Sequence, residues 1–326
     1  MALATLAALA LPAPTALAAA ADLRVGIIGT DSSHSTRIAA AFNDPASKER
    51  TAGARIVVAF KGGSPDVERS ASRVEQFAAE LRDKHGVALV ATIAEVVARS
   101  DAIMILSVDG RAHLPQAREV LGKGKPVFID KPLGGDLASS AAIVRLARET
   151  KTPLLSCSNY RFAAGLAKMK KASPDGFRGA TAYGPATIEP TMPDLYFYGV
   201  HVAEALYTLL GPGCVSVASV HTDDSDVVTG TWSGGRTGVL YGVRGNRVTN
   251  GVVAFGARAT LTETLENSFP EMMRQIVRFF QGGEAPVRIE ETLEIMAFMQ
   301  AAEESKRRGG APVALAELMA QVGAKP

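Results

Sequence analysis

Short apolar runs alternate with amphipathic segments through the first half of the chain, and this alternation most constrains the fold. The amphipathic segments carry apolar residues at helical spacing, and the apolar runs have the length of buried strands. The predicted strands are residues 23–29, 55–60, 87–90, 102–108, 127–129 and 153–156. Strands that alternate with helices form a parallel sheet with right-handed crossovers. The sequence therefore predicts a doubly wound α/β domain, with a helix at about residues 70–85 after the second strand.

The pattern changes after about residue 159. A Ser-Gly-Gly step at residues 233–235 lies between two β-rich segments and is typical of a hairpin. The predicted elements are helices 163–171 and 199–210, strands 215–221, 227–232, 237–243 and 251–255, and helices 272–280 and 291–306. We expect a second, α+β domain with a largely antiparallel sheet.

The composition narrows the function classes. The 326 residues carry a net charge of +2, and no basic run is interleaved with aromatic residues, which argues against a nucleic-acid partner. The two cysteines, Cys157 and Cys214, stand in no CxxC or metal-ligand spacing. We interpret both as small buried side chains, with a disulfide not excluded but unsupported. The five histidines form no HExxH cluster, so no metal site is expected.

Residues 1–21 have the character of a leader. The apolar run from Ala2 to Leu11 is too short to span a bilayer, and Ala16-Leu17-Ala18 suits signal peptidase. No basic residue precedes Arg24, so the signal is atypical or the true start lies upstream of Met1. We expect export to the periplasm or the exterior; the alternative is an Ala-rich disordered tail on a cytoplasmic protein.

A lysine follows the predicted strand at 127–129, in the run Asp130-Lys131-Pro132. Ligands bind outside the carboxyl ends of strands in open parallel sheets, so Lys131 stands where a site is expected. Pro132 favours an extended conformation for the lysine. A lysine against an enclosed pocket can have its pKa lowered enough for acid–base work. The alternative is a surface Lys-Pro turn.

The first turn is placed like a dinucleotide-binding loop between a strand and a helix, but its glycines are incomplete. Gly29 supplies the first glycine of G-x-G-x-x-G, whereas Asp31 and His34 stand at the second and third. An aspartate would repel a pyrophosphate, although serine hydroxyls and helix N-terminal amides could still bind it. The candidate cofactor contacts here are Gly29, Thr30, Asp31, Ser32, Ser33 and His34.

Two further loops follow strands of the same sheet. Lys61 stands near the place of the acid that usually holds an adenosine ribose, and it would favour NADP, whereas Asp66 keeps NAD open. A solvated loop lysine is the alternative. After the fourth strand, Asp109 and His113 supply polar groups, although His113 can also simply open its helix.

The second domain offers a histidine on an apolar helix. His201 and Glu204 are three residues apart and share one helical face, so they are close enough to interact. A histidine oriented by a carboxylate is a suitable general acid–base group near neutral pH. The alternative is a core histidine with its hydrogen bonds satisfied.

Four stretches in order resemble the glucose–fructose oxidoreductase/inositol dehydrogenase/MocA family (Gfo/Idh/MocA). They are Gly26-Ile27-Ile28-Gly29, Asp130-Lys131-Pro132, Asn159-Tyr160-Arg161-Phe162 and Gly199-Val200-His201. The resemblance covers the chain after the leader. It implies a Rossmann dinucleotide-binding domain at 22–156 and an α+β substrate and oligomerisation domain at 157–326, whose open sheet builds dimers or tetramers.

The resemblance also implies roles for single residues. Lys131 matches the lysine of the family's Glu-Lys-Pro motif, which contacts the substrate and the nicotinamide ribose, and Asp130 replaces the glutamate. His201 would hydrogen-bond or deprotonate the reacting hydroxyl, and Arg161 would line the substrate pocket. His113 matches a histidine after strand four.

Two departures mark a divergent subgroup. The aspartate that the family places four residues before His201 is Phe197 here, with Asp194 or Tyr198 as substitutes. The asparagine beside the nicotinamide is Gly110, preceded by Asp109.

The resemblance thus predicts an NAD(P)-dependent oxidoreductase acting on a carbohydrate-like or cyclitol alcohol. Lys131 and His201 would be catalytic; Lys61, Asp109 and Asp130 would join the first turn around the cofactor; Arg161, Asp194 and Tyr198 would contact substrate. An exported member would hold NAD or NADP tightly. The alternatives are glycoside cleavage or epimerisation through a transient keto sugar, and a non-catalytic sugar-binding protein.

Overall fold

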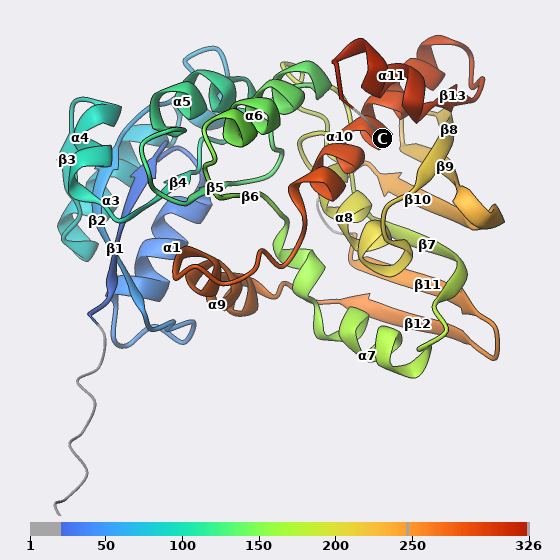
Figure 1. The fold of residues 1–326 in the computed structure, drawn as a ribbon, viewed down its shortest axis with the longest axis horizontal. Helices are drawn as coiled ribbons and strands as arrows, with labels where there is room; N and C mark the ends of the chain where they lie inside the picture. The colour runs from blue at the N-terminus through green and yellow to red at the C-terminus, as the bar shows by residue number, and fades with distance from the viewer. Residues whose placement is uncertain (1–20, 246–247, 325–326) are drawn as a thin grey trace, which may run out of the picture.

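The computed structural model describes residues 21–245 and 248–324. Residues 1–20, which hold almost all of the expected leader, lie outside the described residues. Two sheets stand side by side, the first built from the N-terminal half of the chain and the second mainly from the C-terminal half (Figure 1). In the described part of the chain, no helix combines the length and the apolar character needed to cross a bilayer.

The first sheet has six parallel strands in the order β3-β2-β1-β4-β5-β6. The strands are β1 (Leu23–Ile28), β2 (Ala54–Phe60), β3 (Ala88–Val90), β4 (Ala102–Ile105), β5 (Val127–Ile129) and β6 (Leu154–Leu155). The chain direction across the sheet reverses between β1 and β4, which is where doubly wound sheets bind ligands. The predicted doubly wound domain is confirmed.

The helices of this domain begin where the sequence supplies N-caps. The side chains of Ser32, Thr92 and Asp136 each accept a hydrogen bond from an amide of the first turn. The helices are α1 (Ser33–Asn43), α2 (Glu68–Ala71), α3 (Val74–His85), α4 (Ile93–Arg99), α5 (His113–Val120) and α6 (Leu137–Glu149). The single helix expected at about 70–85 is instead two helices. The Ser70 hydroxyl accepts from the Ser64 amide of the preceding loop and donates to the Asp31 carboxylate of the first turn, and these bonds compete with a continuous helix.

The second sheet has seven strands in the order β12-β11-β7-β10-β9-β8-β13. The strands are β7 (Phe177–Pro185), β8 (Cys214–His221), β9 (Ser225–Trp232), β10 (Thr237–Val243), β11 (Asn250–Gly256), β12 (Thr260–Leu265) and β13 (Val313–Ala314). Only β7 and β10 pair in parallel, so the expected antiparallel character is confirmed. The hairpin at residues 233–235 forms as predicted, with β9 and β10 as its strands. The edge strands β12 and β13 were not predicted.

Helices cover one face of the second sheet. They are α7 (Ala164–Ala172), α8 (Gly199–Leu210), α10 (Ile289–Arg307) and the unpredicted α11 (Leu315–Gln321). Helix α9 (Phe269–Phe280) does not belong to this layer. Both α8 and α10 pack on the strands, and Tyr207, Trp232 and Phe298 meet with ring centroids 5.3–6.1 Å apart. Elsewhere on the sheet Val220, Tyr241 and Phe255 are exposed.

Helix α9 packs on the first sheet although it follows the second in sequence. Met272, Met273 and Ile276 are fully buried and belong to the same core as Val25 and Ile38. Figure 1 shows α9 beside α1, on the far side of the molecule from α11. The chain therefore crosses between the two sheets more than once, which ties the domains together. Cys157 and Cys214 are buried and free, as expected.

We expect Ile276→Ala to lower the free energy of unfolding by about 2–5 kcal/mol, because it opens a cavity in the first domain's core. Arg278→Ala, on the exposed side of α9, is the matched control and should cost less than about 0.5 kcal/mol. Urea titration monitored by circular dichroism measures both. Equal losses for the two variants would contradict the packing of α9 described here.

Candidate active site

A cavity of about 370 Å³ lies between the start of α1 and the second domain. Its walls come from the first turn, the crossover after β6, the start of α8 and the strands near β11. The lining residues are Ser33, His34, Arg37, Asn159, Tyr160, Pro185, Tyr198, His201, Val248, Asn250 and Asn267. The cavity thus joins His201 and Tyr198 of the second domain to His34 of the first.

Lys131 lies near one wall of this cavity without being among its lining residues. It follows β5 after Asp130, and its peptide bond to Pro132 is cis. Its Nζ lies 5.7 Å from the ring centroid of Tyr198, and that ring is 5.8 Å from the His201 ring. The structure therefore brings Lys131 and His201 to the same tyrosine of the cavity wall, although they are seventy positions apart in sequence.

The surroundings of Lys131 lower the pKa of its amine. Burial lowers its pKa, Arg69 lowers it further, and the carboxylate of Asp130 opposes both effects. Its Nζ also lies 5.9 Å from the ring centroid of Phe197, which stands where the family has an acid. Within the described residues Nζ forms no hydrogen bond or ion pair, so it is free to bind a ligand.

Two histidines hold the turn that carries Lys131. The ring nitrogens of His113 lie 2.9 Å from the carbonyl oxygens of Pro132 and Ser107, so this buried ring ties the turn to the end of β4. His34 Nδ1 lies 2.8 Å from Asp130 Oδ2. Burial opposes ionisation of Asp130, but His34 and Lys131 outweigh it and lower its pKa to about 2.

His201 is neutral at pH 7. Burial lowers its pKa well below the usual value, and the positive charges of Lys131 and His34 add to the effect. Its Nδ1 lies 2.6 Å from the hydroxyl of Ser158, and the rings of Tyr160 and Tyr198 stand edge-on to it. Ser158 therefore sets the orientation of the imidazole.

The expected partnership of His201 with Glu204 is wrong. Glu204 accepts hydrogen bonds from Arg161 Nε at 2.6 Å and from the Ser158 amide at 3.2 Å. Helical spacing does place the two side chains on one face, but a buried arginine from another element takes the carboxylate. His201 and Glu204 are linked only through Ser158.

Two predicted substrate contacts are directed elsewhere. Arg161 is buried between Glu204 and Glu291, at 2.6 and 2.8 Å, and these carboxylates raise its pKa although burial opposes them. Asp194 pairs with Lys306 on α10 at 2.6 Å. Neither residue lines the cavity, whereas Tyr198 and His201 do.

Several lining residues were missed by the sequence analysis. Asn159 is 2% exposed, and its Nδ2 has no hydrogen-bond partner within the described residues, so it offers a donor to a ligand. Tyr160 lies beside it, and burial raises the pKa of its hydroxyl. Both stand in the motif Asn159-Tyr160-Arg161-Phe162, which was a usable signal. Asn250 begins β11 and Asn267 lies in the loop before α9, and no sequence motif marked either residue.

One group of described side chains has metal-ligand proximity: Asp194, His221 and Asp226. Lys306 already pairs with Asp194, and Arg244 with Asp226 at 2.6 Å. These two cations neutralise the carboxylates, so the group has the charge balance of an ion-pair cluster.

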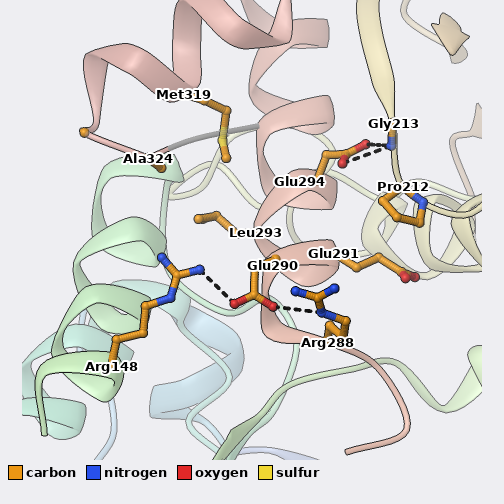
Figure 2. Close-up of a pocket in the computed structure, with 11 residues that line it drawn as sticks. Arg148, Pro212, Gly213, Arg288, Glu290, Glu291, Leu293, Glu294, Met319 and Ala324 are labelled. Atoms are coloured by element: carbon orange, nitrogen blue, oxygen red, sulfur yellow. Dashed lines mark hydrogen bonds and ion pairs between the residues drawn. The ribbon is translucent and has the colours of Figure 1, made fainter. Parts of the chain in front are cut away.

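A larger cavity of about 670 Å³ lies away from these residues, among the ends of α6, α10 and α11 (Figure 2). Figure 2 shows Arg148 and Arg288 both directed at Glu290, at 2.8 and 3.4 Å, while Glu294 accepts from the Gly213 amide. Glu291, which also lines this cavity, pairs with buried Arg161 at 2.8 Å, and none of the predicted site residues lines the cavity.

The expected cofactor is NAD(P). The residues predicted to contact it would need side chains or amides that are free to bind its phosphates and riboses. Asp31 is fully buried, and its carboxylate accepts hydrogen bonds from Ser70 at 2.6 Å and from the Val108 amide at 3.3 Å. Burial raises its pKa. The Thr30 amide donates to the Lys61 carbonyl at 2.9 Å, so it is not free for a phosphate.

The remaining predicted contacts are also engaged. Lys61 pairs with Glu75, and Asp109 with Arg111. Asp130 and His34 bond to each other, and Ser32 caps α1, which leaves Ser33 facing the cavity. In the arrangement described, these residues do not fit an extended dinucleotide.

Part of the chain is similar in sequence to known proteins. Residues 23–156 match the model of the Gfo/Idh/MocA family, described as an oxidoreductase family with an NAD-binding Rossmann fold. The expected cofactor class is therefore that of the matched family. The chain is 32% identical over 127 residues to inositol 2-dehydrogenase 4 of Saccharopolyspora erythraea. That match covers 38% of this chain and 32% of the relative, so the two sequences align over about a third of the relative's length.

Solved structures match over nearly the whole chain. Myo-inositol 2-dehydrogenase from Lactobacillus plantarum aligns with a TM-score of 0.75 and 15% identity, over 90% of this chain and 99% of its own. GenD2 from gentamicin A biosynthesis, solved in complex with NAD, aligns with a TM-score of 0.74 and 16% identity, over 93% and 99%. At these identities the likeness shows a common fold. The family match extends over residues 23–156, so it is the N-terminal domain of this chain that resembles the NAD-binding Rossmann domain of that family.

Proposed function

We propose that this chain is an oxidoreductase that acts on a CH–OH group of a carbohydrate-like or cyclitol alcohol, with NAD(P) as the cofactor class of its family. The observation that carries the proposal is the nearness of Lys131 and His201 to one ring, that of Tyr198, which lines the cavity together with His201. The family match supports the reaction class, and the inositol dehydrogenase named among the relatives supports the substrate class.

The cavity suits a polyhydroxylated ligand. Amides of Asn159, Asn250 and Asn267 and the hydroxyl groups of Tyr160 and Tyr198 surround it. These groups both donate and accept hydrogen bonds, as sugar hydroxyls require. The unpartnered Nδ2 of Asn159 offers one such donor.

Lys131 is the proton acceptor in this proposal. Its neutral amine takes the proton from the substrate hydroxyl as the alcohol is oxidised, and the ammonium returns it in the reverse direction. Its lowered pKa increases the fraction of neutral amine near pH 7.

His201 acts as a hydrogen-bond donor. The Ser158 hydroxyl accepts from the Tyr160 amide at 3.2 Å, so its own hydrogen is best placed toward His201 Nδ1 at 2.6 Å. That assignment leaves the hydrogen of a neutral imidazole on Nε2, which can donate to the substrate oxygen. Arg161 and Glu204 stand behind and hold the helix start in position.

A second candidate is favoured by the contacts made by Asp31 and Thr30, which occupy the phosphate site of the first turn. It is a sugar-binding protein on the same fold that uses the cavity without a hydride acceptor. Saturable polyol binding, with no turnover with either NAD or NADP, would select it.

Export and assembly are further parts of the proposal. The leader pattern supports export. Exposed Val220, Tyr241 and Phe255 on the second sheet are apolar surface of the kind that oligomers bury, which supports a homo-oligomer.

We expect Lys131→Met to lower kcat by about 10²–10⁴-fold, because the acid–base group is lost while the chain keeps its apolar stem. The assay is reduced-nicotinamide absorbance with a panel of inositols and aldoses and either cofactor. Lys123→Met, an exposed lysine after α5, is the control and should keep wild-type turnover. A Lys131→Met enzyme within about threefold of wild type would refute the role.

The pH profile of alcohol oxidation should rise with pH, because the neutral amine is the active form and it dominates above the pKa. Since burial lowers the pKa of Lys131, the midpoint should lie below the ordinary lysine value of about 10.4. Rates of alcohol oxidation measured between about pH 6 and about pH 10 would locate this midpoint. A flat profile, or one that falls as pH rises, would contradict the assignment.

We expect Ser158→Ala to lower kcat about tenfold, the equivalent of one hydrogen bond, because His201 loses the partner of Nδ1. Ser158→Thr keeps the hydroxyl and should restore most of the rate, which a purely structural role would not require. Similar activities of the alanine and threonine variants would show that Ser158 does not position the imidazole.

A further inference from the structure

The connection between β2 and α3 contains a short helix. Residues 61–73 lie between Phe60 and Val74 and include α2. The loop before α2, residues 61–67, is slightly longer than the about 2–6 residues that are usual between a strand and a helix. The segment follows the strand next to β1, so it begins at the groove where a dinucleotide would lie.

The segment is bonded to the first turn. The Lys61 carbonyl accepts from the amide of Thr30 at 2.9 Å and from its hydroxyl at 3.2 Å, and Ser70 donates to Asp31 at 2.6 Å. A Cβ on Gly62 would lie only 3.3 Å from Gly29 Cα, so the backbones are in close contact. Thr30 and Asp31 are both 0% exposed.

The same segment is bonded to the loop after β4. Arg111 joins the carboxylate of Asp66 at 2.9 Å to that of Asp109 at 2.8 Å. Ser64 also donates to Asp109. Because the strand order is β2-β1-β4, a segment that leaves β2 and contacts the β4 loop has to pass over the carboxyl end of β1.

The segment is anchored. Val67 and Ser70 are 1% and 0% exposed, and the Ser64 amide donates to Ser70 Oγ at 2.7 Å. Arg69 reaches the second domain, 5.1 Å from the ring centroid of Phe197. Three carboxyl groups, of Asp31, Asp66 and Asp109, lie along the path, and each already has a hydrogen-bond or ion-pair partner within the protein.

We infer that residues 61–73 and a dinucleotide are mutually exclusive occupants of this groove. The chain's own segment takes the place of the adenosine half, and nucleotide binds only when the Ser70–Asp31 and Arg111–Asp66 contacts open. The proposed function supplies the identity of the nucleotide, but the exclusion concerns binding and holds whether or not an alcohol is turned over.

The test compares wild type with Ser70→Ala/Arg111→Ala, which removes the contacts that close the segment. Calorimetry measures Kd for NAD and NADP, and hydrogen exchange follows the amides of residues 61–73. We expect the double variant to bind at least about tenfold more tightly, because the open fraction divides the apparent Kd. We also expect bound nucleotide to increase exchange in the segment.

Arg82→Ala, which removes an exposed arginine paired with Asp83 on α3, is the matched control and should leave Kd unchanged. Asp66→Ala removes only the exposed Arg111–Asp66 ion pair and serves as the test if the double variant fails to fold. We expect it to bind the nucleotide about threefold more tightly than wild type. Nucleotide that saturates wild type while residues 61–73 stay protected would overturn the inference. The inference would also be overturned if Ser70→Ala/Arg111→Ala and Asp66→Ala both bound nucleotide with a Kd within about twofold of the wild-type value. These outcomes are independent of Lys131→Met, which tests the proposed chemistry.

Discussion

The site depends on the buried ion pair between Arg161 and Glu204. Arg161 lies in the segment where the chain enters the second domain, and Glu204 lies on α8, so their 2.6 Å contact fixes that segment against α8. Glu291 of α10 adds a third member. Loss of one partner in such a group leaves an unpaired buried charge, which typically costs about 3–5 kcal/mol. Because Ser158 donates its amide to Glu204, the same pair also positions the hydroxyl that orients His201.

Burial then gives the two candidate proton-handling groups their character. Burial lowers the pKa values of both Lys131 and His201. Asp130 beside them stays ionised because His34 and Lys131 outweigh its burial. A carboxylate with a low pKa thus lies close to two basic groups whose pKa values are also lowered. This separation of pKa values among neighbours is typical of functional sites.

Local sequence signals accounted for most of the fold. Apolar runs located the strands of the first sheet, and Thr92 and Asp136 marked helix starts because capping is decided within one turn. The short strand β13 and the edge strand β12 lacked such signals. The break between α2 and α3 was invisible because it depends on Ser70 bonding to Asp31, thirty-nine positions away.

The sequence by itself determined the two-domain architecture and the placement of Lys131, Tyr198 and His201 at a strand end and a helix start, because strand ends and helix starts are local properties. Only the tertiary structure decided which charged side chains are free to bind a ligand and which are paired with another side chain. Arg161, Asp194 and Lys61 are each taken by a carboxylate or ammonium group from another element. Periodicity cannot reveal such pairings, since Coulombic and hydrogen-bond partners are chosen by distance in space. For the same reason, only the folded chain showed that residues 61–73 lie across the groove expected to hold a nucleotide.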